Sequence, residues 1–169
     1  TRAKFNEMLT GGVVVTPVQP PVVVVPTGAG LMVALSSNNP AASTIVDGQA
    51  LASLAKLTFT NGDSSEVKVT GLKLKRIGIS ADASIANLYL FDGALRLTDG
   101  SAVSSTMINF NNTAGLFTVP AYGSRTISLL ADISAANAVA GETIGLQVVV
   151  STDVSTNASS VKGTFPITG

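Results

Sequence analysis

The sequence predicts an all-β protein, an antiparallel β-sandwich preceded by an extended N-terminal arm. From about residue 31 onward, apolar and polar residues alternate with the period of two that a half-buried strand shows. Turn signals rich in Gly, Asn, Asp and Pro recur roughly every 8–12 residues, which is typical of sandwiches. Residues 1–30 differ, because they carry bare valine runs bounded by prolines. We therefore expect an arm at residues 1–30 and one β-sandwich domain at residues 31–169.

The amino-acid composition excludes several classes of function. Charged residues make up 12% of the 169 residues, and the formal net charge is zero, which favours association over repulsion. The densest basic cluster is Lys73, Lys75 and Arg76, too small for a nucleic-acid footprint. Cysteine and histidine are absent, which removes thiol chemistry and the commonest general base and metal ligand. We expect no enzyme activity, cofactor, metal or nucleic-acid partner. No apolar run is long enough to predict a membrane span.

The arm begins with a candidate short helix. Within residues 1–10, Phe5, Met8 and Leu9 share one helical face, and Gly11-Gly12 ends the pattern. Two valine runs follow: Val13, Val14 and Val15, and then Val22, Val23, Val24 and Val25. A strand with valine on both faces should be covered on both.

Two roles for the valine runs remain open. They could form the first strand of their own sandwich, or they could add to an open sheet edge of a neighbouring copy. In the second role, main-chain hydrogen bonds supply affinity and the side chains fill pockets. Four buried valines would contribute about 6–12 kcal/mol before ordering costs. We favour the second role, so the seven valines are the predicted subunit interface, with Gly11-Gly12 and Gly28–Gly30 as hinges.

The first long strands show alternation and then a change of phase. Residues 57–60 alternate, Asn61-Gly62-Asp63 signals a turn, and residues 67–70 alternate again. After Gly71 the apolar positions move by one, to Leu72 and Leu74. Such a slip beside glycine predicts a β-bulge. A second slip is predicted at Ile77 and Ile79, which we expect to be core residues.

Later segments continue the same pattern. Residues 88–91 and 95–97 predict a hairpin around Asp92-Gly93. Further strands are predicted within residues 107–110, 116–119, 126–133, 144–150 and 161–167. No segment after residue 30 has a convincing helical period. We favour an immunoglobulin-like sandwich, with a jelly roll as the alternative.

Several motifs suggest chemistry and also have a simpler interpretation. Ser53 and Lys56 match the serine–lysine acyl-transfer spacing, but positions i and i+3 of a strand should face opposite ways. Aspartates beside Gly or Ser are typical of turns, and a calcium site between loops is the alternative. An isopeptide crosslink would draw on lysines and asparagines: Lys56, Lys68, Asn61 and Asn157. Two sequons make Asn111 and Asn157 candidate glycosylation sites, although such triplets also arise by chance in Ser/Thr-rich sequence.

Three stretches carry a resemblance to a known family. The stretch LTFTNGD at residues 57–63, followed by VKV at 67–69, resembles the opening of prokaryotic surface immunoglobulin-like domains. YLFDG at residues 89–93 and VPAYGSRTI at 119–127 are similar to the later strands of those domains. The resemblance covers roughly residues 50–150. It implies an exported structural or adhesive protein, and it carries over no catalytic residue.

These observations predict a structural subunit of an extracellular or cell-surface filament or pilus. Identical subunits would join head to tail, each inserting its valine-rich strand into the next. The alternative is a surface-layer or adhesin module that binds a ligand through its loops, with cell-surface glycans or neighbouring cells as partners. A carbohydrate-binding accessory domain is disfavoured, because aromatics make up 5% of the chain and tryptophan is absent. The first residue, Thr1, is expected to follow a removed leader or to begin a fragment.

Overall fold

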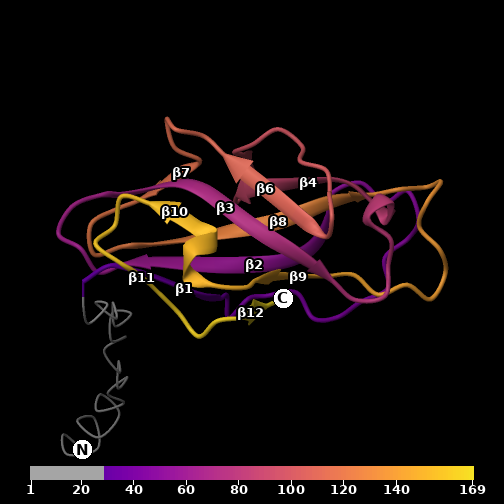
Figure 1. Cartoon of the computed structure of the whole chain (residues 1–169), viewed down its shortest axis with the longest axis horizontal. Coiled ribbons are helices and arrows are strands. Elements are labelled where there is room, and N and C mark those ends of the chain that lie inside the picture. Colours follow the sequence, from indigo (N-terminus) through magenta and orange to yellow (C-terminus); the bar gives the residue numbers. More distant parts are fainter. Residues whose placement is uncertain (1–28) are drawn as a thin grey trace, which may run out of the picture.

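The computed structural model describes residues 29–169, and these residues form an all-β sandwich of two sheets (Figure 1). The predicted helix and both valine runs of the arm lie outside the described residues. The described residues contain no α-helix and two single-turn 3₁₀ helices, η1 (Asp82–Ser84) and η2 (Ser151–Asp153). In chain order the strands are β1 (Leu31–Leu35), β2 (Ala52–Asn61), β3 (Val67–Ile77), β4 (Ile85–Asp92), β5 (Leu95–Arg96), β6 (Met107–Asn111), β7 (Phe117–Val119), β8 (Ser124–Ile133), β9 (Gly145–Val148), β10 (Val154–Thr156), β11 (Val161–Lys162) and β12 (Ile167–Thr168). The predicted β-sandwich is confirmed.

The first sheet has the strand order β11-β1-β2-β8-β4-β5. Its central strands β2 and β8 pair antiparallel over most of their lengths, with Leu57 opposite Ile127. The hairpin predicted around Asp92-Gly93 is present as β4 and β5, in which Asp92 pairs with Leu95. One pairing is parallel: β1 lies beside β11, with Leu31 opposite Val161. The first and last parts of the domain therefore close the same edge.

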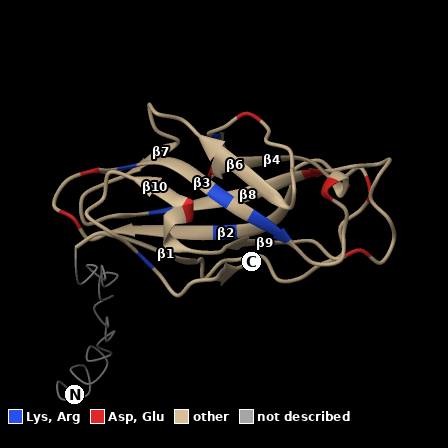
Figure 2. Ribbon diagram, in the orientation of Figure 1, with Lys and Arg blue, Asp and Glu red and all other residues tan. Residues whose placement is uncertain are grey.

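The second sheet is organised around β3. Strands β6 and β7 pair with one edge of β3, and β9 and β10 pair with its other edge. Val69 is paired on its two sides with β7 and β10, and Lys75 is paired on its two sides with β6 and β9. Strand β12 then adds to β9. Lys73 and Lys75 project from β3 to solvent, and Figure 2 shows this basic stretch of the strand.

The core lies between the two sheets and follows the predicted alternation closely. In β2 the buried residues include Leu57 and Phe59, and in β8 the alternate residues Ile127, Leu129, Ala131 and Ile133 are buried. The rings of Phe59 and Phe117 meet edge to face, with centroids 4.9 Å apart, and so connect the two sheets.

The phase slip predicted beside Gly71 is confirmed. The register between β3 and β10 shifts there, because Ser155 pairs with Gly71 while Thr156 pairs with Val69. The second predicted slip is wrong. Arg76 takes the buried position and is 8% exposed, whereas Ile79 is 80% exposed. Strand β3 ends at Ile77, and Gly78, with a φ of 98°, turns the chain away from the sheet before Ile79 is reached.

A bulge in β2 corrects one further expectation. The register between β2 and β8 shifts between Ser53 and Ala55, and Leu54 and Ala55 are both buried. Ser53 and Lys56 therefore share the outer face of the sheet, rather than facing opposite ways as an unbroken strand requires. Lys56 Nζ and Ser53 Oγ form no hydrogen bond with each other in the described structure.

Candidate interaction surfaces

The end of the sandwich at which the described chain begins is named here the arm end; it contains Gly30 and the turn after β2. At its centre lies Asn61, whose side chain is fully buried. The Asn61 amide donates to the carbonyls of Ser65, Val119 and Pro120 at 2.8, 3.2 and 3.0 Å. Its carbonyl oxygen accepts the Asp63 N–H at 2.8 Å. One buried side chain thus satisfies groups from two separate turns.

Asp63 fixes the chain where it leaves the arm. Its carboxylate accepts the Gly30 N–H at 2.7 Å, and it also accepts the N–H and the hydroxyl of Ser159. These bonds, led by the Gly30 N–H, hold the pKa of the Asp63 carboxyl below its ordinary value. Gly30 has a φ of 98°, and a β-carbon there would collide with the Ser160 hydroxyl and carbonyl. The first described residues are therefore anchored closely against the 157–160 turn.

At this end two of the stretches that carry the family resemblance, LTFTNGD and VPAYGSRTI, are in direct contact. Asn61 belongs to LTFTNGD, and Val119 and Pro120 begin VPAYGSRTI. The Asn61 side chain joins the two stretches directly. The sequence showed both turns, but it gave no sign that one asparagine connects them.

The opposite end, named here the apolar end, gathers the loops 36–51, 78–84 and 134–144 at the right of Figure 1. The 36–51 loop is bonded to the end of β8, through Leu51 N–H to Asp132 and Ile133 N–H to the Gln49 carbonyl. The 78–84 and 134–144 loops are bonded to each other, through Thr143 N–H to the Ile79 carbonyl. Four large apolar side chains are exposed on them: Val46 (67%), Leu51 (46%), Ile79 (80%) and Val139 (64%). Sequence reasoning missed this surface, and it had assigned Ile79 to the core.

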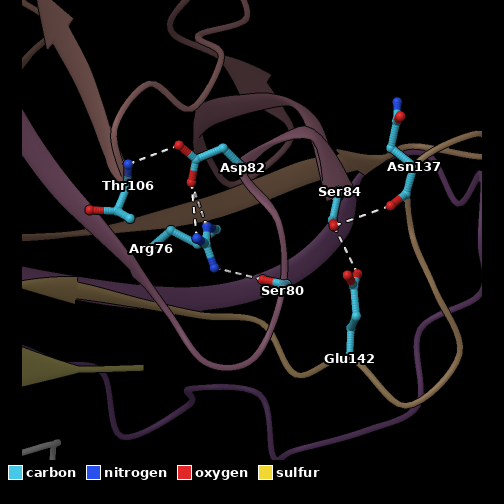
Figure 3. A network of polar contacts seen from close by, with 7 residues as sticks. All are labelled: Arg76, Ser80, Asp82, Ser84, Thr106, Asn137 and Glu142. Carbon is cyan, nitrogen blue, oxygen red and sulfur yellow. Dashed lines mark hydrogen bonds and ion pairs between the residues drawn. The ribbon is translucent and has the colours of Figure 1, made fainter.

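A polar network fixes the loops that carry Ile79 and Val139 (Figure 3). The buried Arg76 guanidinium contacts the Asp82 carboxylate at 2.9 Å and the Ser80 hydroxyl at 2.8 Å. Asp82 also accepts the Thr106 N–H, and this bond is the leading cause of its lowered pKa. The network therefore ties the loop after β3 to the loop before β6.

The second half of this network holds the loop after β8. The fully buried Ser84 hydroxyl lies 2.8 Å from a Glu142 carboxylate oxygen and near the Asn137 carbonyl. This hydroxyl bond is the largest cause of the lowered pKa of Glu142. The same carboxylate oxygen accepts the Val139 N–H at 3.3 Å. Val139 is consequently exposed on a loop whose backbone is pinned to the interior.

The other exposed apolar residues of this end are also held by their backbones. Ile79 N–H donates to the Thr143 hydroxyl at 2.9 Å. Val46 N–H donates to the Gln49 side chain, and Gln49 N–H returns a bond to the Val46 carbonyl. Leu51 has a φ of 50°, a left-handed conformation that is unfavourable for a residue with a branched side chain. Asp132 stabilises it by accepting the Leu51 N–H at 3.0 Å.

A shallow polar hollow of about 500 Å³ lies on the outer face of the first sheet. Its lining residues are Asn38, Lys56, Asp92, Gly93, Pro120, Ser124, Arg125, Thr126 and Ser128. Arg125 forms an ion pair with Asp92, while the buried Nε of Arg125 has no hydrogen-bond partner. The hollow could hold a small polar or anionic group.

The remaining predicted site residues are placed as follows. Asn111 is exposed at the end of β6, and Asn157 is exposed after β10. The Asn157 carbonyl oxygen accepts the Lys68 N–H at 2.6 Å, so its side chain extends the pairing of β10 with β3. The structure does not test whether either asparagine is glycosylated. The seven predicted interface valines lie outside the described residues.

The aspartates serve mainly as turn and loop ligands. Asp153 accepts the nearby Val150 N–H, as turn chemistry predicts. Asp63 and Asp82 instead accept N–H groups from distant segments, those of Gly30 and Thr106. Asp92 and Asp99 pair with arginines instead. Among residues 29–169, no three His, Cys, Asp or Glu side chains come together as a metal site would require.

Comparisons of the chain with protein-family models, with curated proteins and with solved structures found no match. In the part of the chain that the structure describes, no helix has the length and apolarity needed to cross a bilayer.

Proposed function

We propose that this protein is a structural subunit of an extracellular filament or pilus, in which the valine-rich arm of one copy docks on the next copy. The observation that supports the proposal is the position of β1. This strand begins at Leu31, immediately after Gly30, and already pairs with β2 and β11. The described sandwich therefore has a strand β1 that begins after Gly30, and we propose that the valines before Gly30 bind another molecule.

The finer fold proposal is an immunoglobulin-like sandwich. The first sheet contains the order β1-β2-β8-β4, and the second contains β3-β9-β12. With β1, β2, β3, β4, β8, β9 and β12 taken as strands A to G, these orders become A-B-E-D and C-F-G, the arrangement of an immunoglobulin domain. Strands β6 and β7 are then an insertion between D and E that pairs with C.

The described residues begin at one end of the sandwich (Figure 1), which suits assembly in one direction. A contact between the arm of one copy and a different surface of the next is heterologous. Because such a contact need not close on itself, it builds a fibre when repeated.

The test replaces the longer valine run in the full chain. The unmodified protein is expected to form filaments visible by electron microscopy and to scatter light increasingly with concentration. Changing Val22, Val23, Val24 and Val25 to serine should leave monomers with an unchanged unfolding midpoint, because under this proposal the four valines are buried only in the contact with another copy. Changing the isolated Val18 to serine is the matched control and should preserve assembly. An unmodified chain that stays monomeric at every concentration contradicts the proposal.

The second candidate is a surface-layer or adhesin module, and the hollow beside Arg125 favours it. Its lining combines Lys56 and Arg125 with serine and threonine hydroxyls, a suitable set for an anionic or hydroxylated ligand. A monomeric protein that binds immobilised cell-surface glycans, and loses that binding on Arg125→Ser, would support this role over the filament.

A further inference from the structure

We infer that the apolar end is the surface on which the Val22–Val25 run of a neighbouring copy docks. This inference rests on the proposed filament function and identifies the acceptor surface. It starts from exposure: Val46, Leu51, Ile79 and Val139 lie on three loops at one end of the sandwich (Figure 1). Large apolar side chains gathered on one exposed surface commonly mark an interaction site.

The surface is preorganised, which distinguishes it from loop tips that are apolar by accident. Ile79 is held by a pair of bonds to Thr143, and Val139 by bonds to Glu142. Glu142 is itself bonded to the buried Ser84, as Figure 3 shows. Fixing these side chains before binding reduces the entropy lost on docking. The left-handed Leu51 adds backbone strain at the same place, and such strain concentrates at functional positions.

Chain length identifies the occupant as a second copy. Between Val22 and Gly30 the fully extended chain spans roughly 25 Å. Strand β2 runs from the apolar end to the arm end, and its ten residues alone span roughly 33 Å. The Val22–Val25 run therefore cannot reach the apolar end of its own sandwich. Its length is sufficient to reach the apolar end of a copy stacked against the arm end.

Charge is compatible with this contact. The segment from Gly11 to Gly30 contains no charged residue, so docking it buries no charge from the arm. Three carboxylates of the apolar end are bonded within the domain: Asp82 pairs with Arg76, Asp132 accepts bonds from Leu51 and Tyr89, and Glu142 accepts the Ser84 hydroxyl. The exposed apolar side chains, with the exposed Asp47 beside Val46, are then the groups that meet the valines.

The first experiment uses substitution in the full chain. The double variant Ile79→Asp with Val139→Asp places charges on the apolar end and should raise the concentration needed for assembly by at least about tenfold. The matched control is Leu95→Asp, because Leu95 is a comparable 65% exposed but lies in the β4–β5 hairpin. The control should assemble normally. Thermal unfolding of each monomer verifies that the fold is intact.

The second experiment uses the absence of cysteine. A copy carrying Val23→Cys or Val24→Cys is mixed with a copy carrying Ile79→Cys, and the mixture is oxidised. Consecutive valines of an extended strand face opposite ways, so the two arm variants sample both faces. A disulfide between the two kinds of copy is expected, and none is expected when Ile79→Cys is replaced by Leu95→Cys.

The outcomes separate the two proposals. Filaments that form without any crosslink to position 79, or that crosslink equally to position 95, overturn the apolar end as acceptor and leave the filament function standing. Normal assembly of the double aspartate variant does the same. An unmodified chain that forms no filaments overturns both.

Discussion

Polar contacts hold both ends of the sandwich, yet the ends differ in the large apolar side chains they expose: four at the apolar end, and Tyr122 at the arm end. At the arm end, hydrogen bonds converge on the buried Asn61 and on Asp63, and they join turns to one another. At the apolar end, the contacts of Arg76 and Ser84 converge below loops that display apolar side chains. Polar contacts can therefore hold a loop in place while its apolar side chains remain exposed to solvent. The difference gives the domain a direction along its long axis.

The largest expected effect comes from removing the centre of the arm end. Asn61→Ala deletes four hydrogen bonds and leaves three carbonyls and one N–H without their partner. Because the site is fully buried, we expect a loss of about 3–5 kcal/mol of unfolding free energy in urea denaturation. Asn109→Ala is the control, since Asn109 is exposed on β6, and it should change stability by less than about 0.5 kcal/mol. Equal effects would remove the special role assigned to Asn61.

Sequence reasoning reached the fold because the period of two is a direct consequence of a sheet with one buried face. The alternation at Leu57 and Phe59 and the phase slip at Gly71 both correspond to the structure. It failed where the strand ended. The pattern extended the core to Ile79, although Gly78 had already turned the chain into a loop and Arg76 had taken the last buried position.

The candidate surfaces were harder to predict, because each is assembled from loops far apart in the chain. The apolar end brings the loops that carry Val46, Ile79 and Val139 to one end of the sandwich (Figure 1), and no local pattern contains that information. Isolated apolar residues in predicted loops are the signal that could have been noticed. The bonds of Asn61 to Val119 and Pro120 likewise depend on tertiary contact.

The dependence of stability on acid pH tests the comparison, because each end contains carboxylates whose pKa values are lowered. Asp63 acts at the arm end, and Asp82 and Glu142 act at the apolar end. A lowered folded-state pKa contributes stability that is complete above the unfolded value, near pH 4, and is lost as the pH falls through the folded value. The midpoint temperature of thermal unfolding should therefore decrease as the pH is lowered below about 4.

Replacing one carboxylate at a time by its amide shows how much of the acid-induced loss of stability comes from each end. Asp63→Asn and Glu142→Gln should each start from a lower midpoint at pH 7 and should each show a smaller decline between pH 5 and 2 than the unmodified protein. Asp99→Asn is the control, because the Asp99 carboxylate is exposed in its pair with Arg96. A control that flattens the acid limb as much as Asp63→Asn would contradict the assignment.

The smallest expected effect on stability is also the one that separates folding from assembly. Leu51 holds a φ of 50° while its side chain is 46% exposed. Leu51→Gly removes the cost of the left-handed backbone and should raise the unfolding free energy by up to about 1 kcal/mol, whereas Leu51→Ala keeps the strain and should not. Both variants remove the same apolar side chain, so both should weaken assembly at the apolar end. A glycine variant that is less stable than the alanine variant would show that the Leu51 conformation is not strained. A gain in stability combined with weaker assembly would mean that the strained leucine serves contact with another copy, at the expense of the isolated fold.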